Sequence, residues 1–307
     1  NNEYDDSDIE PIQGAFYASS SYTRMFFSKF REQREEELKA KMKPINTEDE
    51  AFILSDTNLI AIKGTPEYAS SINEDSPTNR IITSLYTKDR ILFLLKYGIC
   101  YKTTTNKDGI TQIEKHIMRY PQMFATMAIR DKLREGIRKG VIWHTQGSGK
   151  TALAYSNVRY LTDYFSREEG KIAKFYFIVD RLDLAEQAKS EFEARGLNVK
   201  MIKDKKQFID DIVNPGESNT SGKTTMTVLN IQKFSKESVT KPADYNVNVQ
   251  RVYFLDEAHR SYNPTGSFLA NLMSSDRNAV MIALTGTPLI GEGYNTKDVF
   301  GNYIHKY

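Results

Sequence analysis

Cysteine is almost absent from this sequence, since Cys100 is the only one among 307 residues. A single thiol excludes an internal disulfide framework and favours a reducing compartment, so we expect a cytoplasmic protein. With only four histidines beside that cysteine, a structural zinc site is not expected. No apolar run approaches the roughly 20 residues that a membrane-spanning helix needs. The N-terminus has no signal-peptide pattern, and we therefore expect no membrane association.

A strong net charge is missing as well. The 42 basic and 40 acidic residues leave a formal charge of +2 at pH 7. Such a protein has no global field that attracts nucleic acid, so any contact with DNA must come from a local groove.

The sequence predicts that residues 1–115 form a smaller, mixed α+β segment. The run "FREQREEELKAK" predicts a solvated, charged helix, and "AFILSDTNLIAIKG" predicts a pair of apolar strands. The segment "TKDRILFLLKYGICY" begins with a Thr-x-x-Arg start and has a dense apolar core, which predicts a buried helix.

In residues 116–307, short predicted strands alternate regularly with predicted amphipathic helices. The predicted strands are "GVIW", "KFYFIV", "VKMI", "MTVLNI", "RVYFL" and "VMIAL". The predicted helices include "KTALAYSNVRYLTDYF" and "LDLAEQAKSEFEARG", the second ending at Gly196 as a C-cap. This alternation predicts an α/β fold whose parallel sheet is covered by helices on both faces.

Two segments contain Gly-Lys-Thr, the core of a phosphate-binding loop. In "HTQGSGKT" a strand precedes the glycine-rich turn and a helix follows it, which is the context that lets backbone N–H groups surround phosphates. The second copy, Gly222-Lys223-Thr224, leads directly into a β-branched strand and is expected to be a hairpin-like loop. In the first copy His144 stands where the full pattern has its leading glycine. The candidate phosphate-binding residues are Gly147, Ser148, Gly149, Lys150 and Thr151.

Roles within this loop follow from the chemistry of its side chains. Lys150 would reach the β- and γ-phosphates of a nucleotide, and the Thr151 hydroxyl would bind Mg²⁺.

Acidic and hydroxyl residues follow two later strands. "RVYFLDEAHRS" places Asp256 and Glu257 at the carboxyl end of an apolar strand, where ligand sites of open α/β sheets lie. Asp256 fits a magnesium-binding acid, and Glu257 fits the group that orients or deprotonates the attacking water. His259 is a candidate for relaying the γ-phosphate state to the rest of the domain.

"VMIALTGTPL" places Thr285, Gly286 and Thr287 after another strand. The hydroxyls of the two threonines could bond to the acidic motif or to a nucleic-acid phosphate, so both are candidates for coupling.

The ordered set "HTQGSGKT", "FIVDRLDLAEQ", "TVLNIQKF", "DEAHRS" and "TGTP" resembles the first RecA-like domain of superfamily 2 helicases and translocases. More narrowly, "IWHTQGSGKT", "IVDRLDL", "NIQKF" and "DEAHRS" look like the motor (R) subunit of type I restriction–modification enzymes. The resemblance implies ATP and Mg²⁺ as cofactors and hydrolysis driven by Asp256, Glu257 and Lys150. It also implies double-stranded DNA as the track, cleavage of that DNA in the full enzyme, and methyltransferase and specificity subunits as partners.

Two further sets of residues take roles from this resemblance. "MRYPQMFA" is similar to an adenine-recognition segment, with Gln122 as the base-reading amide and Arg119 nearby, although a plain helix-surface glutamine is the alternative. Arg181, Gln232 and Lys233 would contact the DNA backbone, which provides grip without reading sequence. An ordinary solvated helix start is the alternative for that last set.

Two parts of such an enzyme are not found in the sequence. A complete motor needs a second RecA-like domain with an arginine finger, so we expect a piece of a longer subunit that binds ATP and hydrolyses it slowly. The Glu-x-Lys of the family's nuclease is matched only by Glu37-Leu38-Lys39, which lies in the charged helix. The resemblance therefore implies that residues 1–115 are the tail of a nuclease domain, with a linker, and that the nuclease site itself is not among them. Two alternative hypotheses for the function are the motor of a type III restriction enzyme or repair helicase, and a nucleotide-gated DNA-binding module without turnover.

Overall fold

A computed structural model of the chain describes residues 12–13, 28–41, 47–55, 60–66, 68–69, 84–214, 224–234, 245–257, 268–288 and 295–307. Its Cα atoms group into two compact units, 1–99 and 100–307. The domain boundary at 115/116 falls inside a strand of the second unit and remains a prediction. Within the described residues, no helix combines the length and the apolar character needed to cross a membrane.

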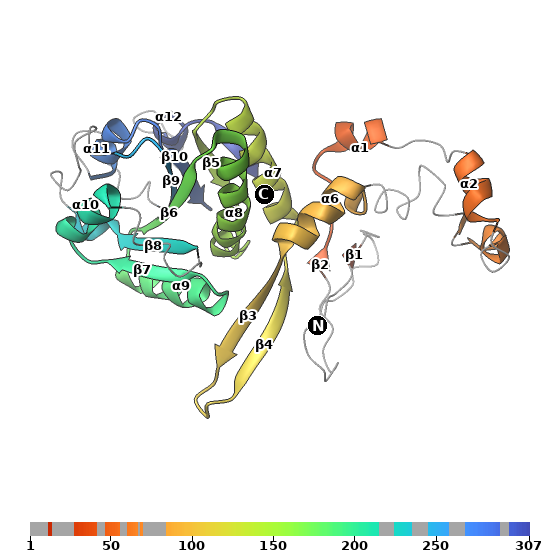
Figure 1. Ribbon diagram of the computed structural model, residues 1–307, viewed down its shortest axis with the longest axis horizontal. Helices are drawn as coiled ribbons and strands as arrows, with labels where there is room; N and C mark the ends of the chain where they lie inside the picture. Colours follow the sequence, from red (N-terminus) through yellow and green to blue (C-terminus); the bar gives the residue numbers. More distant parts are fainter. Residues whose placement is uncertain are drawn as a thin grey trace. The chain divides into compact units, whose positions relative to one another are not determined.

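The second unit is built on a seven-stranded sheet in the order β11-β5-β10-β9-β6-β8-β7 (Figure 1). Every neighbouring pair in it is parallel. Its strands are β5 (Lys139–Trp143), β6 (Ile172–Val179), β7 (Asn198–Ile202), β8 (Thr225–Asn230), β9 (Val249–Asp256), β10 (Val280–Thr285) and β11 (Tyr303–Lys306). The predicted parallel sheet is confirmed, and each of the six predicted strands is present.

Helices cover both faces of this sheet, because its central strands are apolar on both sides. The helical segments are α7 (Tyr120–Arg134), α8 (Lys150–Tyr164), η3 (Phe165–Glu169), α9 (Leu182–Ala194), α10 (Lys205–Val213), η5 (Ile231–Lys233), α11 (Phe268–Ser275) and α12 (Thr296–Phe300). One face packs on α10, α11 and α12, through Phe208, Leu272 and Phe300. On the other face the ring of Phe177 in β6 meets that of Phe192 in α9 edge to face.

Helix α9 illustrates how the sequence sets one of these layers. Ala185, Ala188 and Phe192 are buried and recur at helical spacing, whereas most of the other side chains are exposed. The helix closes at Gly196, whose φ of 85° is in the left-handed region, as the C-cap prediction requires.

A hairpin that the sequence did not predict precedes the sheet in the second unit. It consists of β3 (Ile99–Thr105) and β4 (Thr111–Ile117). Lys102 in β3 forms an ion pair of 2.9 Å with Glu191 in α9. The predicted helix over "TKDRILFLLKYGICY" therefore ends earlier than expected, because β-branched threonines follow Gly98 and favour a strand.

The first unit contains short elements. They are β1 (Ile12–Gln13) and β2 (Ser28–Lys29), which pair antiparallel, α1 (Glu35–Lys41), α2 (Thr47–Ile53), η1 (Ala61–Gly64), α6 (Lys88–Phe93) and η2 (Leu94–Gly98). The charged helix is confirmed as α1. The predicted strand pair is wrong, since this region forms α2 and η1. Acidic residues at the start of "TEDEAFI" favour a helix N-terminus, and Phe52 is 80% exposed instead of lining a strand face.

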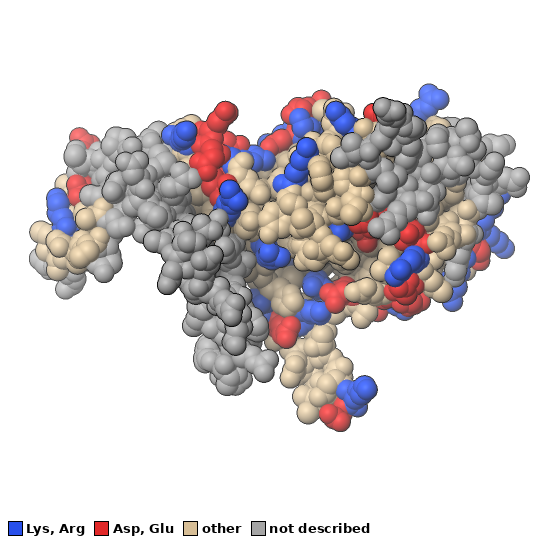
Figure 2. Space-filling model, turned by 180° about the vertical axis from the view of Figure 1, so that it is seen from behind, with Lys and Arg blue, Asp and Glu red and all other residues tan. Residues whose placement is uncertain are grey.

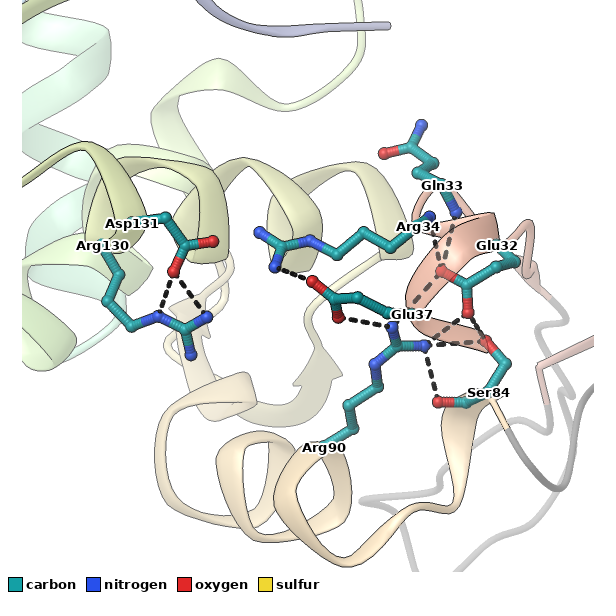
Figure 3. A network of polar contacts seen from close by, with 8 residues as sticks. All are labelled: Glu32, Gln33, Arg34, Glu37, Ser84, Arg90, Arg130 and Asp131. Atoms are coloured by element: carbon teal, nitrogen blue, oxygen red, sulfur yellow. Dashed lines mark hydrogen bonds and ion pairs between the residues drawn. The ribbon is translucent and has the colours of Figure 1, made fainter. Parts of the chain in front are cut away.

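A buried ion pair holds the first unit together (Figure 3). Arg90 in α6 is 3% exposed, and its Nη1 lies 2.6 Å from a carboxylate oxygen of Glu32. The hydroxyl of Ser84 donates to the same carboxylate. Glu37, of the Glu-x-Lys match, lies on helix α1, and its carboxylate accepts a 2.8 Å hydrogen bond from Arg34. Helix α6 is half-buried instead of fully buried, because Leu92 is 55% exposed.

Candidate active site

The phosphate loop lies between β5 and α8, at the carboxyl end of the sheet. Gly147 and Gly149 have φ values of 78° and 86°, which side chains with a Cβ rarely adopt. Gly149 is the N-cap of α8, so the free N–H groups of the first helical turn face the loop. The predicted strand–loop–helix context of the first Gly-Lys-Thr is thus present. Of the second copy, Gly222 and Lys223 lie outside the described residues.

Gln122 contacts this loop directly. Its side-chain amide donates to the carbonyl oxygens of Ser148 and Gly149, both at 3.3 Å, and its Oε1 accepts from the backbone N–H of Arg119 at 2.9 Å. A Cβ on Gly149 would lie 2.5 Å from Nε2 of Gln122, so a larger residue there would displace this amide as well as strain the left-handed backbone. Gln122 is 5% exposed, which excludes a plain helix-surface residue. Its adenine-reading role remains a prediction.

Glu257 joins three of the predicted motifs. Its Oε1 lies 3.5 Å from Nζ of Lys150 and accepts the backbone N–H of Gly286 at 3.0 Å. Its Oε2 accepts the Thr285 hydroxyl at 2.9 Å, so the threonine bonds to the acidic motif. Among the described residues Glu257 is the one non-glycine residue with a positive φ, 51°. A left-handed backbone at such a position is a strain that functional sites often retain.

Asp256 is half-buried beside this cluster, and one oxygen of its carboxylate is fully buried. Its Oδ1 has no hydrogen-bond partner within the described part of the chain. Burial raises the pKa of Asp256 from 3.8 to about 6; Lys150 opposes this rise, whereas Glu257 and Asp180 add to it. A carboxylate destabilised in this way is typical of a site that awaits a cation.

The site fits a nucleotide with Mg²⁺ in its polar groups. Besides Asp256, the buried hydroxyl of Ser148 has no hydrogen-bond partner among the described residues. Thr151 is the second residue of α8 and is partly exposed. The described residues hold no group of three metal-binding side chains. Mg²⁺ commonly takes only one or two protein ligands and fills its shell with phosphates and water, so a site with few protein oxygens is compatible with it.

His144 and Trp143 are site residues whose contacts sequence reasoning missed. The His144 ring is fully buried, and its Nε2 lies 2.7 Å from Nδ1 of His305 in β11. Burial lowers the pKa of His144 to about 3, and His305 and Lys150 contribute, so the ring is neutral at pH 7. The indole N–H of Trp143 donates to the carbonyl of Gly286 at 3.3 Å. Strand β11, which was not predicted, supplies His305, whereas Gly286 follows β10.

Several predicted residues lie at the edge of this cluster. Arg119 is the N-cap of α7, and its Nη2 lies 3.5 Å from the hydroxyl of Tyr307. Thr287 is exposed, and its backbone N–H donates to the Thr285 hydroxyl at 3.1 Å. His259 lies outside the described residues. The cofactor role of Arg119 and the coupling roles of Thr285, Thr287 and His259 remain predictions.

The residues proposed to contact DNA follow β6 and β8, whose carboxyl ends lie at the same end of the sheet as the phosphate loop. The side chain of Arg181 is 60% exposed and forms an ion pair of 2.6 Å with Asp183. Gln232 is exposed in η5, and the side chain of Lys233 lies outside the described residues. The two segments meet at a cavity of about 310 Å³, lined among others by Leu182, Glu186 and Asn230.

The sequence signature of the SWI2/SNF2 ATPase family matches residues 121–307, more than half of the chain. The chain therefore belongs to this family of ATPases. This confirms the resemblance to a superfamily 2 motor domain, whose first lobe the sheet and its phosphate loop represent.

Curated relatives agree with the narrower resemblance. The endonuclease subunit of the type I restriction enzyme SsaAORF53P from Staphylococcus saprophyticus is 31% identical over 200 residues, which cover 62% of this chain and 20% of the relative. The HindI endonuclease subunit from Haemophilus influenzae is 28% identical over 250 residues, which cover 76% of this chain and 23% of the relative. The chain thus spans about a fifth of the length of these relatives.

A solved structure of the ATP-dependent Type ISP restriction-modification enzyme LlaBIII bound to DNA aligns with a TM-score of 0.45 and 12% identity. The alignment covers 67% of this chain and 16% of that one.

Proposed function

We propose that this chain is the ATP-hydrolysing part of a motor that moves along double-stranded DNA, within the R subunit of a type I restriction enzyme. Membership of the SWI2/SNF2 ATPase family and similarity to type I endonuclease subunits support the proposal. The observation that carries it is the carboxylate of Glu257, which meets both the phosphate-loop lysine and the Thr285–Gly286 turn.

Each group in the site has a place in this chemistry. Lys150 and the N–H groups at the start of α8 would bind the phosphates, and Gln122 with Arg119 would contact the adenine. Thr151 and Asp256 would hold Mg²⁺, which when bound neutralises charge on the phosphate oxygens. Glu257 would orient the attacking water and accept its proton. Thr285 and Gly286 fix both oxygens of that carboxylate, so it need not reorganise during the reaction.

The DNA track would run past the segments that follow β6 and β8. Arg181, Gln232 and Lys233 would contact backbone phosphates there, and His259 and Thr287 would couple the nucleotide state to that grip. On the face shown in Figure 2, basic and acidic side chains are interspersed, in keeping with grip by a few local contacts. Methyltransferase and specificity subunits would complete a cytoplasmic complex that also cleaves DNA.

The test measures binding of a fluorescent ATP analogue and phosphate release, with and without duplex DNA. Lys150→Ala removes a charged hydrogen-bond donor, so the analogue should bind about 10- to 100-fold more weakly. Lys132→Ala, at an exposed lysine near the end of α7, is the matched control and should bind like the wild type. Equal binding by all three proteins would refute the nucleotide assignment.

Turnover separates the motor from its alternative. An arginine finger is worth about 10³–10⁵ in rate where a motor has one, so phosphate release is compared with and without duplex DNA in the same protein, which keeps that contribution constant. Stimulation of that release by duplex DNA supports a motor. Nucleotide-dependent DNA binding with no release at all would instead favour a gated binding module.

A further inference from the structure

Strand β11 contains an irregularity that changes which side chains face each side of the sheet. Tyr303 pairs with Val141 and His305 pairs with Ile142, so two steps along β11 correspond to one step along β5. An extra residue of this kind is a β-bulge, which redirects the side chains that follow it. The bulge therefore places Tyr303 and Lys306 on one face of the sheet and His305 on the other.

Each face of β11 contacts one of two consecutive residues. These are Trp143, the last residue of β5, and His144, the first residue of the phosphate loop. On one face the rings of Trp143 and Tyr303 are 5.5 Å apart, and Nζ of Lys306 lies 5.3 Å and 4.6 Å from their centroids. A cation above two aromatic faces is attracted to both. On the other face His305 bonds to His144, the first residue of the loop. Strand β11 thus holds the start of the loop from both sides.

Trp143 extends this support to the acidic motif. Its indole N–H bonds to the carbonyl of Gly286, and the N–H of Gly286 bonds to Glu257. A Cβ on Gly286 would lie 3.3 Å from the carbonyl oxygen of His144, so the backbone of Gly286 runs directly against the phosphate loop. Movement of the indole would therefore shift the turn that orients Glu257.

We infer that Trp143, held by Lys306 and Tyr303 of β11, is a positioning residue that fixes Gly286 and, through it, the carboxylate of Glu257. The His144–His305 contact anchors the same loop from the opposite face. This inference rests on the proposed ATPase function and adds to it a residue that touches neither the phosphates nor the water.

The experiment uses the fact that Trp143 is the single tryptophan of the chain. In the wild type, Mg²⁺-ATP should change the tryptophan emission in a saturable way, with the same midpoint as binding measured by calorimetry. Trp143→Phe keeps an aromatic ring beside Lys306, removes the N–H bond and makes the ring smaller. We expect its ATP affinity to stay within about threefold, while single-turnover hydrolysis slows about tenfold, as for other groups that orient a reacting residue.

Tyr253→Phe is the matched control, because it removes an aromatic hydrogen-bond donor, to Asp276, elsewhere in the sheet. It should lower thermal stability and leave single-turnover hydrolysis unchanged. Lys306→Met, at an exposed position, is a second variant that keeps Trp143. It should slow hydrolysis by roughly threefold, since loosening a ring without removing its bond has a smaller effect.

The outcomes separate the two hypotheses. If the wild type does not bind ATP in the calorimeter, the proposed function fails and the inference fails with it. If the wild type binds and hydrolyses ATP but Trp143→Phe and Lys306→Met hydrolyse it at the wild-type rate, only the inference is overturned. A fall in the rate of Trp143→Phe that is matched by Tyr253→Phe also overturns it, because the effect would then be a general loss of stability.

Discussion

Strand β9 has a charged residue near each end, Arg251 and Asp256, and the surroundings of these two residues differ. Near its start, the guanidinium of Arg251 binds both carboxylate oxygens of Asp276, at 2.5 and 3.0 Å, and Tyr253 donates to the same carboxylate. At its end, Asp256 has a buried oxygen with no partner in the described part of the chain.

A second network, near the starts of β6 and β7, also pairs a buried acid with basic side chains. Asp211 of α10 is buried between Lys174 of β6 and Lys200 of β7, at 3.2 and 2.8 Å, and the Thr227 hydroxyl donates to it. Burial alone would raise the pKa of Asp211, but the two lysines outweigh burial and lower it.

The contrast distinguishes charge that supports the fold from charge that serves a ligand. A buried ion with all its hydrogen bonds made is stable without any addition. A buried carboxylate with a raised pKa is destabilising until a cation arrives, and such groups concentrate at functional sites. The carboxyl end of the sheet is therefore less stable in the absence of a ligand than the opposite end, where the buried charges are paired.

The largest expected effect comes from removing one partner of the ion pair near the start of β9. Asp276→Ala leaves the guanidinium of Arg251 buried without its carboxylate, which should lower the free energy of unfolding by about 3–5 kcal/mol. Urea denaturation measures this loss. ATP affinity at a temperature where the variant is folded should stay near the wild-type value, because the network is remote from the phosphate loop.

A double variant is the control for that prediction. Arg251→Met with Asp276→Leu removes both charges and fills their space with apolar groups, so most of the lost stability should return. If Asp276→Ala weakens ATP binding as strongly as it weakens the fold, the two ends of the sheet are not independent and the contrast fails.

The next effect has the opposite sign. A pKa raised from 3.8 to about 6 corresponds to about 3 kcal/mol against the ionised form of Asp256. Asp256→Asn removes that charge, so the ligand-free variant should be more stable than the wild type by up to this amount at pH 7. Hydrolysis should fall by at least about 100-fold, since a group aimed at reacting charge is lost.

The pH dependence of this gain identifies its cause. Between pH 4 and 6 the folded wild type keeps the proton of Asp256 while the unfolded chain has released it, so the wild type loses stability as pH rises. The gain from Asp256→Asn should therefore be small near pH 4 and complete above pH 6. His144, whose pKa is lowered to about 3, has the opposite slope up to about pH 6.5, but it is common to both proteins and cancels in the difference.

Denaturation with a chelator present, at several pH values, measures that difference. A gain that does not change with pH would show that the stabilisation is not due to the ionised carboxylate.

Sequence patterns predicted the sheet and the motifs at its edge because both are local. Strands such as "RVYFL" are apolar on both faces, and Asp256 follows one of them directly. Strand β11 was missed because it has four residues, and its partner β5 lies about 160 residues earlier. The run "AFIL" predicts a strand but ends helix α2, because a short apolar run has the same pattern in a strand and at the end of a short helix.

The site shows the same limit. The positions of Lys150 and Glu257 could be predicted, since each follows a strand in a recognisable motif. The bonds of Gln122 to the loop carbonyls and of Trp143 to Gly286 could not, because they join segments 26 and 143 residues apart. Such bonds depend on tertiary packing, which no local pattern contains.

The smallest expected effect comes from adding one methyl group where the turn meets the loop. In Gly286→Ala the new Cβ would lie 3.3 Å from the backbone of Gln146 and His144 and 3.6 Å from Nζ of Lys150. The loop must give way by a few tenths of an ångström, so stability should fall by about 1 kcal/mol. Hydrolysis should fall more than that change implies, because the shift moves Lys150 relative to Glu257.

Gly64→Ala, where a Cβ has open space, is the control and should leave both quantities unchanged. A variant at Gly286 that hydrolyses ATP normally would show that the contact between turn and loop is not needed for the reaction.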